Sequence, residues 1–586
     1  MSMSRNTKLG STRSQTIWMQ ISLLLLGLMV TVPFLNPIHH HPIPSFYGEW
    51  WALVLGLLAA TAGLLAAPVR LVLPSILKLP ALFLAVVLVQ WLAGMIAYPE
   101  FALFHIGYLA WAAVIVTMSA TLSDRIGRDR LFRSIAAAIL VGALLSAGIA
   151  FAQRLNLSIS PELMFPQRGG RMLGNIAQSN KLGSYLWLGI LSVLYLREQK
   201  AVSNLAAFVF VLLLGTATGL TGSRMALANG VALVLAACFA YRIGTRSDNR
   251  FRISFLLLAL AMLLGAKPLF SNLPRTGMEP VSAAERLTES NIGGDARIEL
   301  WRDTLTIIGD HPWVGNGAGN FPWRMVEAAA RAPAGAATHP GAEHSHNIAL
   351  QVAADFGIPL LALSAAILAI WLFHLRKSRL DGSMCFGLAV LIVWAIHSLL
   401  EYPLWYTDAL GIFCLVLGAI DPRAASVAYP ARRPILPAAL AAGVLALMPL
   451  RLDYARLDEA TNRIPGTPTA ADWKQRIDTV ADIAKNSGLG SYAYIALGSL
   501  LEPEERLAAA QSHVCERAMK LWPDAAIIAR CAYLRHLTGR TAEGKELLEM
   551  ALAAYRDSSK QAAIGTALEL AAKKNPGAKA GVFPVR

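Results

Sequence analysis

Residues 343–375 read EHSHNIALQVAADFGIPLLALSAAILAIWLFHL. A short polar segment ends at Asn347, and an almost wholly apolar run follows from Ile348 to Leu375. Because a bilayer core about 30 Å thick needs roughly 20 apolar residues for each helical crossing, this run predicts a transmembrane helix. The polar segment before it is then held at a membrane surface.

Apolar runs of similar length recur along the whole chain. Apolar residues make up 55% of the 586 residues, charged residues make up only 15%, and the mean hydropathy is +0.49, unlike the composition of a soluble domain. We therefore predict an all-α polytopic membrane protein with about 13 transmembrane helices. The candidate spans are 17–35, 49–67, 79–97, 101–121, 134–153, 182–196, 203–219, 225–241, 253–270, 348–374, 384–399, 405–420 and 434–450.

The net charge of +15 also suits a nucleic-acid-binding protein, but the positions of the basic residues favour a topology signal. Lysine and arginine gather in alternate loops, at 5–13, 70–78, 125–133, 197–200, 242–252, 376–379 and 423–433. By the positive-inside rule these loops are cytoplasmic. The intervening polar loops and the C-terminal tail are then expected on the outer side.

The polar segments divide the chain into four predicted parts. They are an N-terminal bundle of about nine helices at 1–270, an outer loop at 271–347, about four further helices at 348–451, and an outer tail at 452–586. Amphipathic segments in the tail, at 505–520, 524–538 and 541–557, resemble helical hairpins of the tetratricopeptide type. Cys515 and Cys531 lie on successive predicted helices, so they either stay free or form a disulfide in an oxidising compartment.

Two outer segments in the first half of the chain carry polar residues suited to binding. The segment before the span at 182–196 contains Arg171, Asn175, Gln178 and Asn180. Side-chain amides supply donors and acceptors for sugar hydroxyls, although the same segment also suits a solvated turn that caps the next helix. Arg224 stands at the start of the span at 225–241, where an arginine either extends to the interface or binds an anion.

The outer loop at 271–347 contributes Arg297. Apolar residues at 298, 301, 305 and 308 recur at helical spacing, which predicts an amphipathic helix with Arg297 in its first turn. Backbone amides at a helix N-terminus and a guanidinium both favour anions. The two features together predict a phosphate site.

His346 ends the same loop. An isolated histidine near a membrane is more often a structural interfacial residue than a catalyst, but here Asn347 is placed to orient the imidazole. A later outer loop puts Glu401 and Tyr402 at the same level of the membrane. We expect Glu401 to have a partner, an arginine or a histidine, because an unpaired carboxylate there is costly.

In this order, the motifs resemble those of a known family. His346-Asn347, separated by nine residues from Gly357, resembles the signature of bacterial O-antigen ligases, O-antigen polymerases and protein O-oligosaccharyltransferases. The segments 174–180, 297–317 and 401–406 look like the protein O-oligosaccharyltransferase branch, the pilin glycosylation ligases. Leu360 departs from the signature, which usually has Gly, Thr or Tyr at that position.

This resemblance implies a glycosyltransferase in the bacterial cytoplasmic membrane with its active site facing the periplasm. Family members move a preassembled glycan from undecaprenyl pyrophosphate to an acceptor, here the Ser or Thr hydroxyls of a periplasmic protein such as pilin. The implied catalytic residues are His346 as the base and Arg224 and Arg297 on the pyrophosphate. The implied substrate-binding residues are Arg171, Asn175, Gln178, Asn180, Asn347, Glu401 and Tyr402. We expect no cofactor and no metal.

Other functions stay open at this point. The acceptor of an O-antigen ligase is lipid A core, and that of a polymerase is another glycan. A lipid or polysaccharide transporter predicts charged residues buried in mid-span and internal repeats, neither of which stands out in the sequence.

Overall fold

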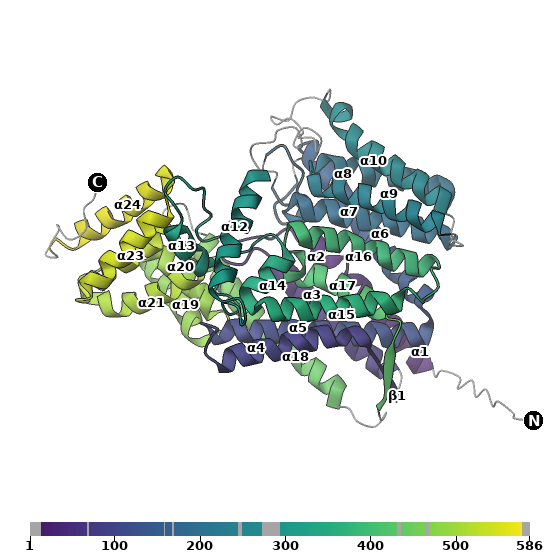
Figure 1. The fold of residues 1–586 in the computed structure, drawn as a ribbon, viewed down its shortest axis with the longest axis horizontal. Coiled ribbons are helices and arrows are strands. Elements are labelled where there is room, and N and C mark those ends of the chain that lie inside the picture. Colours follow the sequence, from purple (N-terminus) through teal and green to yellow (C-terminus); the bar gives the residue numbers. More distant parts are fainter. Residues whose placement is uncertain are drawn as a thin grey trace, which may run out of the picture.

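The computed structural model is a bundle of long helices with a second group of shorter helices at one end (Figure 1). It describes residues 13–66, 69–157, 159–166, 169–243, 249–271, 294–429, 435–463, 466 and 468–576. The first half contains α1 (Arg13–Met29), α2 (Val32–Leu35), α3 (Phe46–Ala66), α4 (Lys78–Leu92), α5 (Pro99–Ile126), α6 (Arg128–Arg154), α7 (Ser179–Glu198), α8 (Asn204–Leu220), α9 (Arg224–Arg242) and α10 (Asn249–Ser271). The second half contains α12 (Gly294–Asp310), α13 (Phe321–Arg331), α14 (Ile348–Phe356), α15 (Ile358–Leu375), α16 (Gly382–Leu400), α17 (Thr407–Ile420) and α18 (Ile435–Asn462).

Ten of the described helices are long and apolar enough to cross a membrane. Two shorter apolar helices, α8 and α17, also coincide with predicted spans. The prediction of a mostly helical, multi-pass membrane protein is confirmed, with one short two-stranded ribbon in addition, whereas the count of about 13 crossings stays a prediction. Helix α7 matches the predicted span at 182–196, but it is not among the ten and has charged residues at both ends, Lys181, Arg197 and Glu198.

The predicted single span at 348–374 is wrong, because the run forms two helices, α14 and α15. Gly357 separates them with a φ of +90°, a conformation that strongly favours glycine, and Pro359 then starts the second helix. A Cβ atom at Gly357 would lie 2.5 Å from the carbonyl oxygen of Trp313. The break therefore also lets another loop approach the backbone closely.

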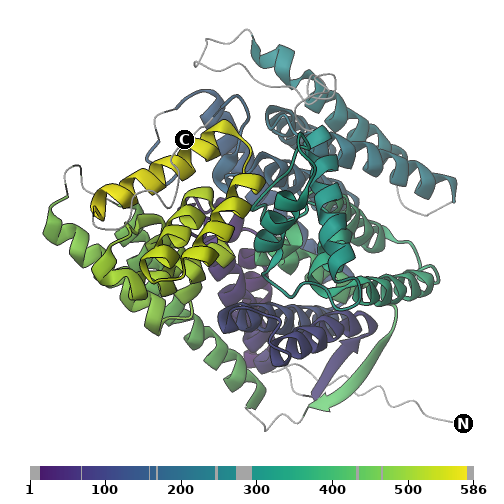
Figure 2. The same cartoon turned by 60° about the vertical axis from the view of Figure 1, so that its left-hand side comes forward.

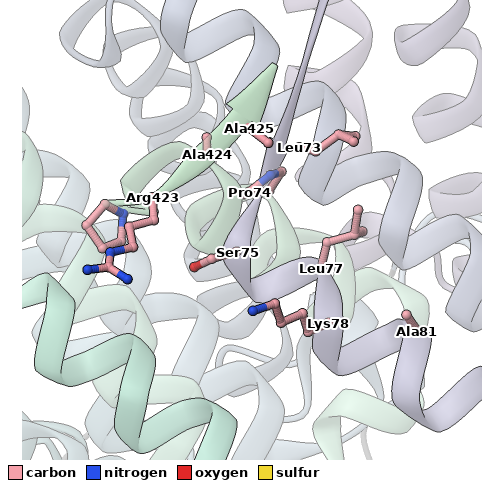
Figure 3. Close-up of a pocket in the computed structure, with 10 residues that line it drawn as sticks. Leu73, Pro74, Ser75, Leu77, Lys78, Ala81, Arg423, Ala424 and Ala425 are labelled. Atoms are coloured by element: carbon pink, nitrogen blue, oxygen red, sulfur yellow. The ribbon is translucent and has the colours of Figure 1, made fainter. Parts of the chain in front are cut away.

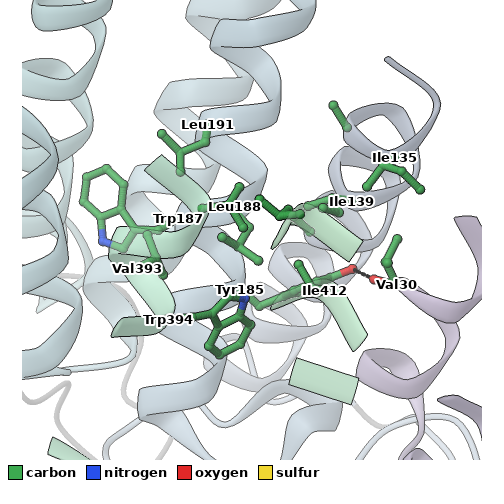
Figure 4. Close-up of a cluster of buried hydrophobic side chains, with 14 of the residues drawn as sticks. Val30, Ile135, Ile139, Tyr185, Trp187, Leu188, Leu191, Val393, Trp394 and Ile412 are labelled. Atoms are coloured by element: carbon green, nitrogen blue, oxygen red, sulfur yellow. Dashed lines mark hydrogen bonds between the residues drawn. The ribbon is translucent and has the colours of Figure 1, made fainter. Parts of the chain in front are cut away.

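Helix α7 forms the centre of the bundle, packed against α6, α8, α9 and α16. Its Tyr185 and Trp187 are fully buried, together with Trp394 from α16 (Figure 4). Both α7 rings keep a hydrogen bond, from Tyr185 to the carbonyl of Val30 at 2.8 Å and from Trp187 to that of Ala226 at 2.7 Å. Satisfying these donors makes large aromatic residues compatible with an apolar core. The polar start of α7 is thus held inside the protein.

The chain after the membrane helices is also helical. Its helices are α19 (Ala470–Asn486), α20 (Gly490–Leu500), α21 (Ala508–Leu521), α22 (Ala525–Leu537), α23 (Thr541–Ala554) and α24 (Ser558–Lys574). A disulfide joins Cys515 on α21 to Cys531 on α22. In Figure 2 these yellow-green helices lie beside the teal segment that contains α13, which packs against α23. The resemblance to tetratricopeptide hairpins stays a prediction.

The loops meet at the two ends of the bundle. At one end, β1 (Val69–Pro74) and β2 (Ala424–Tyr429) pair in an antiparallel ribbon, which joins two loops predicted to be cytoplasmic. An ion pair of 2.6 Å between Arg128 and Asp381 joins two more. At the other end, His40 in the first predicted outer loop contacts Asp458 of α18 at 2.7 Å. Loops predicted to share a side thus contact one another.

Candidate active site

Glu401 is the centre of a polar cluster that joins three of the predicted site residues. It follows α16 directly, and its side chain is only 9% exposed. Its Oε2 accepts a hydrogen bond from Nδ1 of His346 at 2.6 Å. Its Oε1 accepts from the guanidinium of Arg297 at 2.8 Å and from the amide of Asn180 at 3.0 Å. Residues more than 200 positions apart in the sequence therefore share one carboxylate.

The charge state of Glu401 follows from these contacts. Burial by itself would raise the pKa of this carboxyl, but the hydrogen bond and charge of His346, together with the charge of Arg297, outweigh burial and lower the pKa. Glu401 is therefore a carboxylate at neutral pH and can only accept hydrogen bonds. Nδ1 of His346 must then be the donor, which leaves Nε2 of the neutral ring able to take a proton.

The backbone around His346 holds the imidazole in place. His346 itself has a φ of +54°, a left-handed conformation that is uncommon for residues other than glycine and is concentrated at functional sites. The preceding Ser345 is buried, donates its N–H to Gln351 at 2.7 Å, and accepts from the indole of Trp301 on α12 at 3.0 Å. Asn347 caps α14 by accepting from two backbone amides.

Helix α14 is in turn anchored at its other end. The carbonyl of Asp355 accepts hydrogen bonds from the N–H of Gly317 at 3.1 Å and from Nε2 of Gln90 on α4 at 2.8 Å. Gly315 has a φ of +72°, and a Cβ atom there would lie 2.3 Å from the same carbonyl oxygen. These contacts explain the glycines after Pro312, which let the loop following α12 lie directly on α14.

Asn180 extends the cluster to the start of α9. Its Oδ1 accepts from the hydroxyl of Ser223 at 2.8 Å and from the guanidinium of Arg171 at 3.1 Å. Ser223 is the N-cap of α9, and Arg224 is the first residue of that helix and is half-buried. The structure thus brings Arg171, Asn180, Arg297, His346 and Glu401 into one network, with Arg224 adjacent to it through Ser223.

Asn175 and Gln178 are nearby but have their side chains engaged with the backbone. Asn175 is buried; it accepts from the N–H of Phe165 at 3.0 Å and donates to the carbonyls of Leu35 and Leu163 at 2.9 Å. Gln178 caps α7 by accepting from the N–H of Lys181 at 2.7 Å. These bonds favour a role in shaping the loop over direct contact with a substrate.

Aromatic rings cover one side of His346. Tyr402 lies edge-on to this ring with 5.1 Å between centroids, and it also packs against His344 at 4.1 Å. Trp405 also packs edge-on against His344, with 5.8 Å between ring centroids. Burial, together with the neighbouring His346, lowers the pKa of His344 to about 3, so His344 is neutral at any physiological pH. Unlike His344, His346 has a carboxylate partner, Glu401.

A buried ion pair that was not predicted from the sequence lies next to Asn180 of this cluster. Lys181 and Asp408 are both buried and lie 2.6 Å apart, and the ammonium also sits 4.4 Å from the centroid of Tyr406. A lysine one residue before a predicted span is a signal that could have found it, because a charge at that depth needs a partner.

The three consecutive histidines at 39–41, in the loop between the first two predicted spans, do not converge on a common point. His39 bonds the carbonyls of Asn175 and Pro44, at 2.6 and 2.9 Å, whereas His40 pairs with Asp458. Across the parts of the chain that the structure describes, no three His, Cys, Asp or Glu residues gather as metal ligands.

Parts of this chain match two family models and are similar to two known proteins. Residues 208–365, which include Arg224, Arg297 and His346, match the family model described as O-Antigen ligase, and residues 385–568 match "Virulence factor membrane-bound polymerase, C-terminal". A General O-oligosaccharyltransferase of Acinetobacter baylyi is 28% identical over 408 residues, 68% of this chain and 69% of that protein. A ComP-specific O-oligosaccharyltransferase of the same species is 24% identical over 335 residues, 56% of this chain and 59% of that protein.

Proposed function

This chain belongs to the O-antigen ligase superfamily, alongside the protein O-oligosaccharyltransferases, and from that premise we propose that it transfers glycans to proteins. The donor in this proposal is a preassembled glycan on undecaprenyl pyrophosphate, and the acceptors are Ser or Thr hydroxyls of periplasmic proteins such as pilin. The observation that carries it is Glu401, which holds an imidazole and a guanidinium side by side at the end of the membrane bundle.

His346 is the general base. As the acceptor oxygen attacks the anomeric carbon, its proton passes to Nε2, while Nδ1 keeps its hydrogen bond to Glu401. The carboxylate stabilises the imidazolium that forms, as the buried acid does in a Ser-His-Asp triad. Such a base contributes typically about 10²–10⁴ in rate.

Arg297 and Arg224 act on the leaving group. When the bond between the anomeric carbon and the pyrophosphate oxygen breaks, its electron pair stays with the pyrophosphate, and guanidinium groups stabilise that charge. Arg297 uses one terminal nitrogen for Glu401, and a guanidinium has five N–H donors in all, so others are available for phosphate oxygens. On this proposal transfer needs no metal and is insensitive to EDTA.

The remaining residues divide into two groups. Asn180 bonds Glu401, Arg171 bonds Asn180 and Tyr402 packs against His346, and these three residues orient the sugar or phosphate. Asn175, Gln178 and Asn347 act through the backbone that they support. A periplasmic location of this end is supported by the disulfide between Cys515 and Cys531, since disulfides persist in oxidising compartments.

Transfer in vitro tests the proposal. Purified protein is mixed with an undecaprenyl-pyrophosphate glycan and a pilin, and wild type is compared with His346→Ala, Arg297→Ala and the matched control Arg302→Ala, an exposed arginine on the same helix. We expect His346→Ala to lose about 10²–10⁴ of the rate and the control to stay within about twofold. Equal glycosylation by all four proteins would refute the site, and product on lipid A core alone would instead favour an O-antigen ligase.

A further inference from the structure

A cavity of about 740 Å³ lies beside the β1–β2 ribbon, far from the candidate active site. It sits where the ribbon meets the start of α4, whereas Gln90, near the other end of that helix, contacts the loop segment that anchors α14. The face is the one rich in Lys and Arg, which the positive-inside rule makes cytoplasmic. Nothing in the proposed glycan transfer uses this cavity.

The charge that lines the cavity is purely positive. Lys78 and Arg423 are its only charged lining residues, and Figure 3 shows them on either side of Ser75, whose hydroxyl lies between them. Both side chains are exposed, and neither has an ion-pair partner within the described part of the chain. Two cations on either side of one point, without ion-pair partners in the described residues, form a site suited to a phosphate group.

Asp421, which does not itself line the cavity, holds the backbone close to both cations. Its carboxylate accepts from the hydroxyl of Ser75 at 3.0 Å, from the N–H of Ile76 at 2.8 Å and from the N–H of Arg423 at 2.8 Å. The indole of Trp371 donates to the same group at 3.1 Å. Four donors thus take up the negative charge of Asp421 and fix the backbone on both sides of the cavity.

The rest of the lining is apolar. Leu73, Leu77 and Ala81 contribute to it, and the last two belong to a membrane-spanning segment, Ser75–Leu92, of which only 17% is buried in the protein. A molecule in this cavity would therefore meet cations at the membrane surface and hydrocarbon directly beneath them. A free phosphate ion uses only the first of these features.

The geometry points to an anionic phospholipid of the cytoplasmic leaflet, such as phosphatidylglycerol, as the occupant. Its phosphate lies between Lys78 and Arg423, and its acyl chains follow α4 into the bilayer. A basic residue near a membrane surface contributes about 1 kcal/mol toward anionic lipid, which is about five-fold in retention for each cation.

Native mass spectrometry of the purified full chain tests this assignment, with phosphatidylglycerol, phosphatidylcholine and inorganic phosphate as the three probes. We expect wild type to retain phosphatidylglycerol over phosphatidylcholine, and the double variant Lys78→Gln/Arg423→Gln to lose that preference by about five-fold or more. The matched control, Arg130→Gln/Lys200→Gln, removes two exposed charges from the same face away from the cavity and is expected to behave as wild type.

A conservative variant, Lys78→Arg/Arg423→Lys, keeps both charges and is expected to keep the preference, which separates loss of the site from loss of folding. Equal retention of the two lipids by wild type would overturn the assignment. So would an equal loss in the double variant and in its charge-matched control, or binding of inorganic phosphate without any preference between the lipids.

Discussion

Glu401 makes the contacts of a residue that positions other groups. Three of the roughly four acceptor positions of its carboxylate are used by His346, Arg297 and Asn180, so its contacts are mainly with other protein groups. The expectation that an acid at this level would hold an arginine or a histidine is confirmed, and it holds one of each. The sequence could not show the third contact, because nothing local in α7 says which distant carboxylate its amide will meet.

Replacing Glu401 by Gln tests the orienting role. A glutamine has one acceptor oxygen in place of two, so it cannot accept from both Nδ1 of His346 and the guanidinium of Arg297, and without a charge it stabilises an imidazolium less. We expect kcat to fall by about 10–100-fold with little change in KM, as for other residues that orient a functional imidazole. Transfer kinetics measure this; Glu299→Gln on α12 is the control, and a KM effect alone would argue against the role.

The lowered pKa of Glu401 also predicts a pH dependence of stability. A carboxyl whose pKa is lower in the folded state stabilises the fold above its unfolded pKa of about 4.3, and this contribution is lost as the pH falls through the folded value. Thermal unfolding in detergent is therefore expected to show wild type more stable than Glu401→Gln at neutral pH, with the difference shrinking below about pH 4. A constant difference across that range would contradict the assignment.

At the scale of elements, hydropathy predicts where helices lie but not where they break. The mainly apolar pattern continues through Gly357 despite Gln351 and Asp355, so α14 and α15 looked like one span, and a backbone requirement at that glycine separates them. Similarly, glycines at 315, 317 and 319 are typical of a turn, but a sequence does not show the carbonyl of Asp355 against which Gly315 packs. Such contacts depend on tertiary structure, which a local pattern does not encode.

Gly315→Ala tests how tightly that turn is packed. The new methyl group would meet a backbone carbonyl that cannot rotate away, and the left-handed φ adds strain, so we expect a loss of about 2–3 kcal/mol in stability and most of the transfer activity. Gly309→Ala, in α12 with open space around the added atom, is expected to be neutral. Thermal unfolding and transfer assays compare the two, and equal behaviour would contradict this account.

At the scale of the whole molecule, one helix links the membrane bundle to the terminal helices. Helix α18 runs from Ile435 to Asn462, across the boundary predicted at 451, and the first outer loop contacts it through His40 and through the hydroxyl of Tyr454. The terminal helices thus pack against α18 on one side and against α13 on the other. Composition predicted a separate tail, but these attachments involve few residues and leave no compositional signal.

The disulfide predicts both stability and compartment. It closes a loop of 16 residues, so Cys515→Ala/Cys531→Ala is expected to destabilise the terminal helices by about 3 kcal/mol, measured by chemical unfolding of the full chain. In cells, a variant that lacks Cys238, Cys385 and Cys414 should react with a maleimide only after unfolding and reduction. Labelling of the unfolded protein without reductant would place these cysteines in a reducing compartment.

The anchoring of α14 by Gln90 has a genetic consequence. This buried glutamine on α4 also donates to the carbonyl of Val314 and accepts from the N–H of Ala318. It therefore fixes the segment 314–318, which packs against α14, the helix that follows His346. In a saturation screen scored by loss of product, position 90 would then behave as an essential site although it meets no reactant, and suppressors of its defects would map to positions 314–318.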